Sequence, residues 1–452
     1  MTQPSVAPHL GLDFGTTNSG AAIYDGHRVH VLALDEASTD PRVVRSVLYI
    51  TREHQVFIGK RAIDTYYSQN IGRPSRMMRQ FVGEIEMTFA EVGTFIRDVY
   101  VLVDEFAPGR LLRSLKSGLA SSYEGTSILG RFYSLEELIA LYLRQIRERA
   151  EIAIGCPVRS VALGRPVRFV GSTGAADDQR AQQRLRQAAE MAGFAHVTFE
   201  LEPVAAALHY ELSISQPQTI AVFDFGGGTL DITVMRVGEP GKQQVHATGG
   251  ISIAGDVFDQ RIVEGMLLEH LGRGSTYSED RVPFPNAYTD AVASWQTVLE
   301  LSKPDALHFM GVAQLTSSHP ARVRALQSLV VNNYAGQVFD EVEKAKIHLS
   351  ESYLSVIRFA GQDVNLWQPL TRSQFVALIA EETSRVEACL RETIARSGLE
   401  PGEIDAVVRT GGSAQIPCFV EMLGRVFGSD KVVLSDAFSS VTSGLALRAA
   451  ML

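Results

Sequence analysis

The chain has 452 residues, more than one compact core accommodates, so we expect two or three domains. Hydrophobic residues make up 45% of it, charged residues 21%, and the formal net charge is −9. No overall positive field would therefore attract nucleic acid or an anionic membrane, and we expect neither as a partner. The start of the chain lacks a secretory leader, and no apolar run approaches the roughly 18 residues of a membrane span, so we expect a cytoplasmic protein.

The first predicted element is a hairpin with an unusual turn. Residues 10–24 read LGLDFGTTNSGAAIY, two apolar strands joined through Asp13, glycine and hydroxyl residues. Glycines let backbone N–H groups approach an anion, and threonine hydroxyls add donors. Asp13 would repel a phosphate held there unless a cation such as Mg²⁺ lay between them. The pattern therefore indicates a phosphate turn beside a metal site, whereas an ordinary Asp-Gly hairpin is the simpler alternative.

Strands and helices alternate along the rest of the chain, which predicts an α/β protein with largely buried sheets. SVALGRPV at 160–167, a helix at 177–194 and VTFE at 197–200 form one strand, helix, strand succession. Residues 73–116 and 272–290 look irregular and are interpreted as insertions. The hairpin pattern then recurs at 221–235 as AVFDFGGGTLDITVM. This repeat argues against the simpler alternative and predicts that Asp13 and Asp224 are ligands of one metal ion.

Four further segments fit a nucleotide site. Glu202 precedes Pro203 at the start of a helix, where its carboxylate could order water or merely balance the helix dipole. Gly255 opens a helix after an apolar strand, in ISIAGDVF. EVEKAKIHLSES at 341–352 places three polar side chains on one helical face, which could equally be a solvated surface. VVRTGGSAQIP at 407–417 offers a glycine turn on which a ribose or base can lie.

In this order, the segments resemble the nucleotide-binding domain of the 70-kDa heat-shock (DnaK-type) chaperone family, and most closely its YegD-like branch, over nearly the whole chain. The resemblance implies an α/β actin-like ATPase fold, with two lobes each built on a duplicated ribonuclease-H-like sheet with inserted subdomains. Lobe I would comprise residues 1–212, with an insertion at 56–118 and the connecting helix from 202. Lobe II would comprise 213–436, with a helical insertion at 261–350 and the adenosine turn at 410–417, and 437–452 would return to lobe I as a helix.

The resemblance also implies ATP or ADP and Mg²⁺ as ligands and assigns roles to residues. Asp13 and Asp224 would hold hydrated Mg²⁺, with Asp231 positioning its water shell, while Glu202 and Thr229 would orient the attacking water. The phosphates and the nucleoside would be held by Gly15, Thr16, Thr17, Asn18, Gly226, Gly227, Gly228, Gly255, Glu343, Lys346, Ser350, Gly411, Gly412 and Ser413. A catalytic lysine is expected, for which Lys116 is the candidate and Arg113 or Lys60 the alternatives. Pro166 resembles the proline that couples ATP to a partner domain.

Two departures from the family matter. Ile347 and Gln415 stand where the chaperones place two arginines around adenine, which is expected to loosen the base. No interdomain linker or peptide-binding domain follows GLALRAAML, so we expect no client capture within this chain. The preferred function is a slowly hydrolysing ATP switch that reports to a regulatory or client protein. A metabolite kinase, a filament-forming ATPase and a non-hydrolysing nucleotide sensor remain as alternatives.

Overall fold

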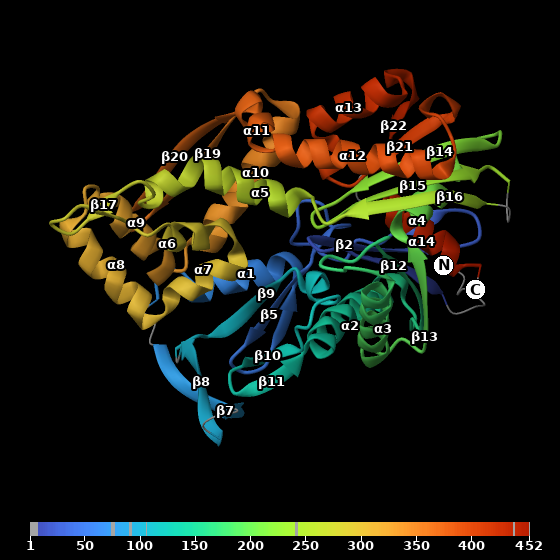
Figure 1. Ribbon diagram of the computed structural model, residues 1–452. Coiled ribbons are helices and arrows are strands. Elements are labelled where there is room, and N and C mark those ends of the chain that lie inside the picture. The colour runs from blue at the N-terminus through green and yellow to red at the C-terminus, as the bar shows by residue number, and fades with distance from the viewer. Residues whose placement is uncertain are drawn as a thin grey trace. The chain divides into compact units, whose positions relative to one another are not determined.

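The computed structural model describes residues 8–73, 77–89, 93–104, 106–239, 243–436 and 439–451. These residues divide into two compact units (Figure 1). The first unit lies within Met1–Tyr66, Gly109–Phe258 and Ile379–Leu452, and the second within Tyr67–Pro108 and Asp259–Leu378. Helices α1 (Gly59–Asn70) and α5 (Gly255–Ile262) each contribute residues to both units.

The first unit contains two sheets with the same strand order. One sheet runs β13 (His196–Leu201), β12 (Ser160–Arg165), β1 (His9–Phe14), β2 (Asn18–Tyr24), β3 (Val29–Val31), with β4 (Val44–Arg45) also pairing β2. The other runs β22 (Val432–Leu434), β21 (Ala406–Thr410), β14 (Gln218–Phe225), β15 (Leu230–Val237), β16 (Gln244–Ile251). In both, the central strand pairs in parallel with one neighbour and antiparallel with the strand that follows it. This duplication is the predicted α/β actin-like architecture, and it puts Asp13 and Asp224 at equivalent positions on β1 and β14.

Two helices connect these sheets. Helix α4 (Glu202–Glu211) packs on β14 and β15, α14 (Ser440–Ala449) packs on β1, β2 and β12, and the two helices pack on each other. Their contact is close, because a Cβ added at Gly444 would lie 1.7 Å from the Ala205 carbonyl oxygen. A side chain at position 444 would therefore force the helices apart.

Other helices cover the opposite faces of the sheets. α2 (Leu135–Ile154) and α3 (Ala175–Met191) share one hydrophobic core with β1, in which the rings of Phe14 and Tyr142 lie 5.5 Å apart. A capping box at Ser134 and Glu137 begins α2, and Gly155, with φ 82°, ends it. α12 (Ala380–Ser397) and α13 (Pro417–Phe427) lie along the other sheet (Figure 1), where Phe419 packs on Phe225.

Short elements complete the first unit. They are β5 (Val47–Thr51), β6 (Val56–Ile58), β9 (Gly109–Arg113), β10 (Gly125–Ile128), β11 (Arg131–Ser134) and the 3₁₀ turn η1 (Leu115–Gly118). β5 pairs with both β6 and β9, and β10 pairs with β11. The strand β9 leads directly into η1, and this connection determines where the Lys116 backbone lies.

The second unit combines helices with hairpins. Its helices are α6 (Asn286–Asp290), α7 (Trp295–Val298), α8 (Pro304–Thr316), α9 (Pro320–Val331), α10 (Ala335–Glu351) and α11 (Arg372–Leu378). Its strands are β7 (Met77–Phe89), β8 (Gly93–Asp104), β17 (Thr276–Tyr277), β18 (Val282–Pro283), β19 (Leu354–Gly361) and β20 (Val364–Thr371). The β7–β8 hairpin shows that the expectation of irregular structure over 73–116 was wrong. A register shift between Phe81 and Gly83 interrupts the pairing, and such a bulge breaks the two-residue alternation that identifies a strand in a sequence.

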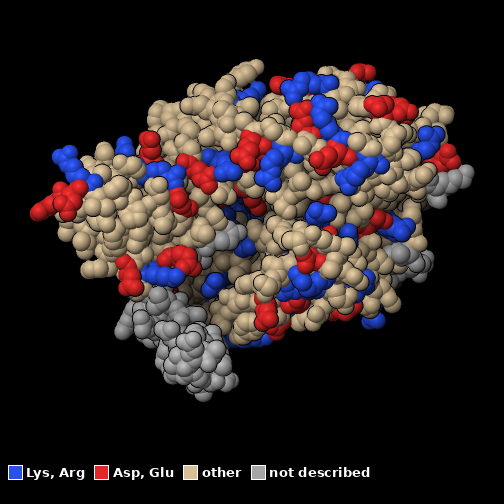
Figure 2. All heavy atoms as spheres, in the orientation of Figure 1, with Lys and Arg blue, Asp and Glu red and all other residues tan. Residues whose placement is uncertain are grey.

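Charged residues of both signs are interspersed on one face of the molecule (Figure 2). On the face shown in Figure 2, Lys and Arg alternate with Asp and Glu, and neither sign forms a continuous patch. Within the described part of the chain, no helix combines the length and apolar character needed to cross a membrane.

Candidate functional site

The two predicted phosphate turns, here called the first and second glycine turns, lie against each other. The first, at 15–18, follows β1, and the second, at 226–229, follows β14. A Cβ added at Gly227 would lie 1.9 Å from Thr17 Oγ1, and one at Gly228 would lie 2.5 Å from Thr16 Oγ1. Any larger residue at these positions would clash, which explains the glycines. The structure thus brings together two segments that are over two hundred residues apart.

The second turn is also joined to the adenosine turn and to the start of α5. Ser413 Oγ donates to the Gly226 carbonyl at 2.6 Å, and Gly411, with φ 83°, would place a Cβ 2.3 Å from the Phe225 carbonyl oxygen. The Gly255 N–H donates to the Gly226 carbonyl at 3.3 Å, and the following N–H donates to the Gly227 carbonyl at 2.9 Å. Three of the predicted segments therefore share one backbone network.

A serine that the sequence reasoning missed supports the first turn. Ser46, which follows β4, donates its hydroxyl to the Gly15 carbonyl at 2.7 Å and its N–H to the Thr17 carbonyl at 2.9 Å. Its hydroxyl also lies 2.8 Å from that of Ser19. Nothing in the local sequence around Ser46 indicates this contact, because the acceptors are backbone carbonyls.

Beside the turns lies a cluster of four carboxylates and one ammonium group. Lys116 and Glu202 are buried, 6% and 8% exposed, and Lys116 Nζ donates to Glu202 Oε1 at 2.5 Å. Asp231 is 1% exposed and accepts a hydrogen bond from the Val167 N–H at 2.7 Å. Asp13 and Asp224 are half-buried at the ends of β1 and β14. The cluster therefore has an excess of negative charge.

The titration of these groups reflects that excess. Burial, followed by the charge of Glu202, raises the pKa of Asp13 and that of Asp231 to about 7 each. Burial, then Glu202, Asp231 and Asp13, raise the pKa of Asp224 well above its usual value. Burial acts to lower the pKa of Lys116, but the neighbouring carboxylates outweigh it and raise that pKa. Lys116 is thus held in its charged form.

The contacts distinguish the lysine candidates. Lys60 is 43% exposed and pairs with Asp64, and Arg113 ends β9. Of the three, Lys116 is the one that forms an ion pair with Glu202 in the cluster. This geometry supports Lys116 as the cation of the site.

A divalent cation fits the donors present. Carboxylates whose raised pKa values reflect burial and mutual repulsion would be relieved by a hard cation, and oxygen is the ligand that Mg²⁺ prefers. Among the described residues, no three His, Cys, Asp or Glu side chains are grouped closely enough to hold a metal directly. The predicted site differs, since it uses Asp13 and Asp224 through a water shell.

Three further predicted contact residues belong to the second unit. Glu343, Lys346 and Ser350 lie on α10, where Lys346 is 9% exposed and donates to Asp259 Oδ2 at 2.7 Å. Ile347 is 60% exposed on the same helix, and Gln415 is exposed in the first unit. Their assignment to ribose and base stays a prediction.

Comparison with known proteins agrees with this geometry. The family model described as Hsp70 protein matches residues 9–276 and 330–452. Chaperone protein dnaK3 of Synechococcus elongatus is 29% identical over 454 residues, covering 98% of this chain and 50% of the relative. Chaperone protein DnaK of Trichormus variabilis is 27% identical, covering 98% of this chain and 54% of the relative. Chaperone protein DnaK of Thermus thermophilus is 26% identical, covering 99% of this chain and 61% of the relative.

These relatives are longer than the present chain, which spans 50 to 61% of their length. Residues 277–329 fall outside the family match. The match nevertheless includes every segment that forms the two glycine turns and the charged cluster. The chain belongs to the Hsp70 family.

Proposed function

We propose that this chain is a Mg²⁺-dependent ATPase that hydrolyses ATP slowly and works as a switch. The observation that carries the proposal is the meeting of the two glycine turns beside the buried Lys116–Glu202 pair. Glycine turns offer backbone N–H groups to phosphates, and an adjacent cation and carboxylate are what phosphoryl transfer to water requires.

Each residue of the cluster has a distinct role in this mechanism. Mg²⁺, when bound near Asp13 and Asp224, would neutralise charge on the phosphates. Lys116 stays protonated because its pKa is raised, so its ammonium can stabilise charge that develops on the γ-phosphate. Glu202 accepts from Lys116 through one oxygen and can orient the attacking water with Thr229. Asp231, which accepts from the Val167 N–H, would position the water shell of the metal.

The turns and the nucleoside segments would bind the rest of the nucleotide. Gly15 to Asn18 and Gly226 to Thr229 would hold the phosphates. Gly255, the 411–413 turn and the α10 residues would hold the ribose and base. The supporting contacts are the hydrogen bonds that join Gly226 to Ser413 and to Gly255. Lobes at 1–212 and 213–436 would each contribute one of the duplicated sheets.

A switch needs a connection from the nucleotide site to a surface that binds a partner protein, so that the conformation of this surface depends on the bound nucleotide. Val167 follows Pro166 directly, and its N–H donates to Asp231, which lies on β15 and pairs in register with Asp224 on β14. A change at the second turn would thus displace the segment that contains the proline. We propose a regulatory or client protein in the cytoplasm as the reader, in keeping with relatives named chaperones.

Binding and turnover test the proposal. Calorimetry with ATP and ADP should show binding in Mg²⁺ and weaker binding in EDTA, and single-turnover assays should show slow release of phosphate. Complete absence of nucleotide binding would refute the proposal. The exposed Ile347 and Gln415 favour a second candidate, a nucleotide sensor without hydrolysis. Binding of ATP with no phosphate released, and no difference between the wild type and Lys116→Ala, would support that candidate instead.

A further inference from the structure

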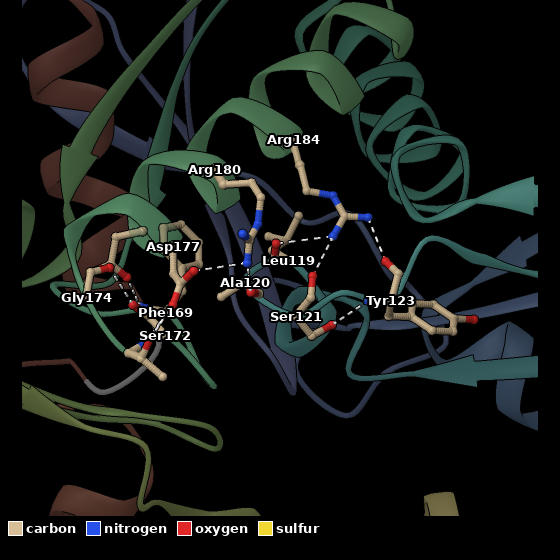
Figure 3. Close-up of polar contacts among 12 residues, drawn as sticks. Leu119, Ala120, Ser121, Tyr123, Phe169, Ser172, Gly174, Asp177, Arg180 and Arg184 are labelled. Carbon is tan, nitrogen blue, oxygen red and sulfur yellow. Dashed lines mark hydrogen bonds and ion pairs between the residues drawn. The ribbon is translucent and has the colours of Figure 1, made fainter. Parts of the chain in front are cut away.

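One arginine of α3 binds the loop that follows Lys116 (Figure 3). Arg184 Nη1 donates to the carbonyls of residues 118, 119 and 121 at 3.3, 3.2 and 3.3 Å. Its Nη2 donates to the Tyr123 carbonyl at 2.8 Å, and its Nε donates to Glu136 on α2. All three nitrogens of the guanidinium therefore donate either to one short loop or to one carboxylate.

This arrangement is unlike a surface ion pair. The side chains of Arg184 and Glu136 are only 13% and 14% exposed. Burying a guanidinium is costly unless it is paired and hydrogen-bonded, and here four backbone carbonyls and a carboxylate accept from it. Arg180, one turn earlier on α3, adds a bond to the Ala120 carbonyl at 2.5 Å. The loop at 118–123 is consequently fastened to α3 along its whole length.

The fastened loop is continuous with the backbone of Lys116. The 3₁₀ turn η1 ends at Gly118, whose carbonyl is the first acceptor of Arg184, and the Leu119 N–H donates back to the Lys116 carbonyl at 3.2 Å. Ser114, which precedes the turn, has φ 54°, a left-handed conformation that costs energy for a residue with a Cβ. A turn of four residues with a strained entry needs support from outside, and α3 supplies it.

The same helix is linked to β15, the strand that follows the second glycine turn. The Phe169 N–H donates to Asp178 in the first turn of α3 at 2.9 Å, and two residues earlier Val167 bonds to Asp231. One end of α3 is thus connected to Asp231 and its middle to the Lys116 loop. Lys116 and Asp231 are two members of the same charged cluster.

We infer that Arg184 is a positioning residue that holds the Lys116 ammonium in place for hydrolysis by fixing the 118–123 loop. The inference rests on the proposed ATPase function for its kinetic consequence. A displacement of about 1 Å in a catalytic group can cost about a hundredfold in rate, so loss of the bonds should reduce turnover without removing any group that contacts the nucleotide.

The kinetic test compares two arginines of one helix. Arg186 donates to the Val197 carbonyl at 2.6 Å and lies 5.1 Å from the Phe199 ring, but has no bond to the loop, so Arg186→Ala is the matched control. Arg184→Ala should lower the single-turnover rate at least about tenfold with the ATP dissociation constant within twofold, while Arg186→Ala changes neither. Arg184→Lys should restore little, because one ammonium cannot span four carbonyls. Rates equal to the wild type in Arg184→Ala would overturn the inference.

A second measurement does not depend on ATP. Lys116 is 6% exposed and should resist acylation by a water-soluble amine reagent in the wild type and in Arg186→Ala. In Arg184→Ala, mass spectrometry should show acylated Lys116 and faster amide exchange over 118–123. If the wild type does not hydrolyse ATP, the ATPase proposal fails, and the labelling still decides whether Arg184 holds the loop. Protection of Lys116 in Arg184→Ala equal to the wild type would refute the inference.

Discussion

Asp231 should make the ligand-free protein less stable as the pH rises. Burial and the charge of Glu202 raise the pKa of this carboxyl from 3.8 to about 7. Between pH 3.8 and about pH 7, the folded state therefore still binds this proton, whereas the unfolded state has released it. Stability from this group is complete below pH 3.8 and is lost as the pH rises through 7. A shift of about three pKa units corresponds to about 4 kcal/mol, of which about 3 kcal/mol should be lost between about pH 5 and pH 8.

The variant Asp231→Asn tests this prediction, because asparagine keeps the shape and can still accept from the Val167 N–H. Urea unfolding of both proteins without nucleotide or Mg²⁺ should show that the variant loses about 3 kcal/mol less than the wild type between about pH 5 and pH 8. The variant should nevertheless hydrolyse ATP more slowly. Equal pH dependence of the free energy of unfolding in the two proteins would show that Asp231 is not held protonated, and would refute the reasoning.

Four further substitutions test the remaining roles. Lys116→Ala should remove hydrolysis while leaving ATP affinity within a few fold, measured by single turnover and calorimetry, and a normal rate would reassign the lysine. Asp224→Ala should abolish Mg²⁺-dependent hydrolysis and Thr229→Ala should slow it; unchanged turnover in both would leave the second turn with only a structural role. Gln415→Arg should tighten ADP binding by about 0.5 to 2 kcal/mol in calorimetry, and no change would mean that this position does not contact adenine.

The parts of the candidate site that could be predicted are those where the backbone conformation or burial requires a particular residue type. A turn that must approach another turn requires glycine, and a carboxylate at the end of a buried strand requires a partner, so Asp13, Gly227 and Asp224 were recognisable. The duplicated strand order follows from the same two hairpins. Lys116 was only one of three candidates, because its partner Glu202 is 86 positions away and no spacing connects them.

Other features have no signature in a single sequence. Ser46 and Arg184 act on backbone carbonyls, which every residue has, so their partners cannot be read from residue types. The β7–β8 hairpin was missed because the bulge near Gly83 shifts the alternation of its strand. The predicted lobes remain untested, since the compact units group residues of both predicted lobes into one body.

The contact between Gly444 and Ala205 has a consequence for how the duplicated halves can evolve and be engineered. Ala205 lies one helical turn after Glu202 on α4, so the separation of the two helices also sets how far the Glu202 carboxylate reaches toward the ammonium it meets. Even a single methyl group at position 444 would act as a wedge at this crossing. Such a wedge would change the distance between the Glu202 carboxylate and the Lys116 ammonium, without altering any residue that a nucleotide could contact.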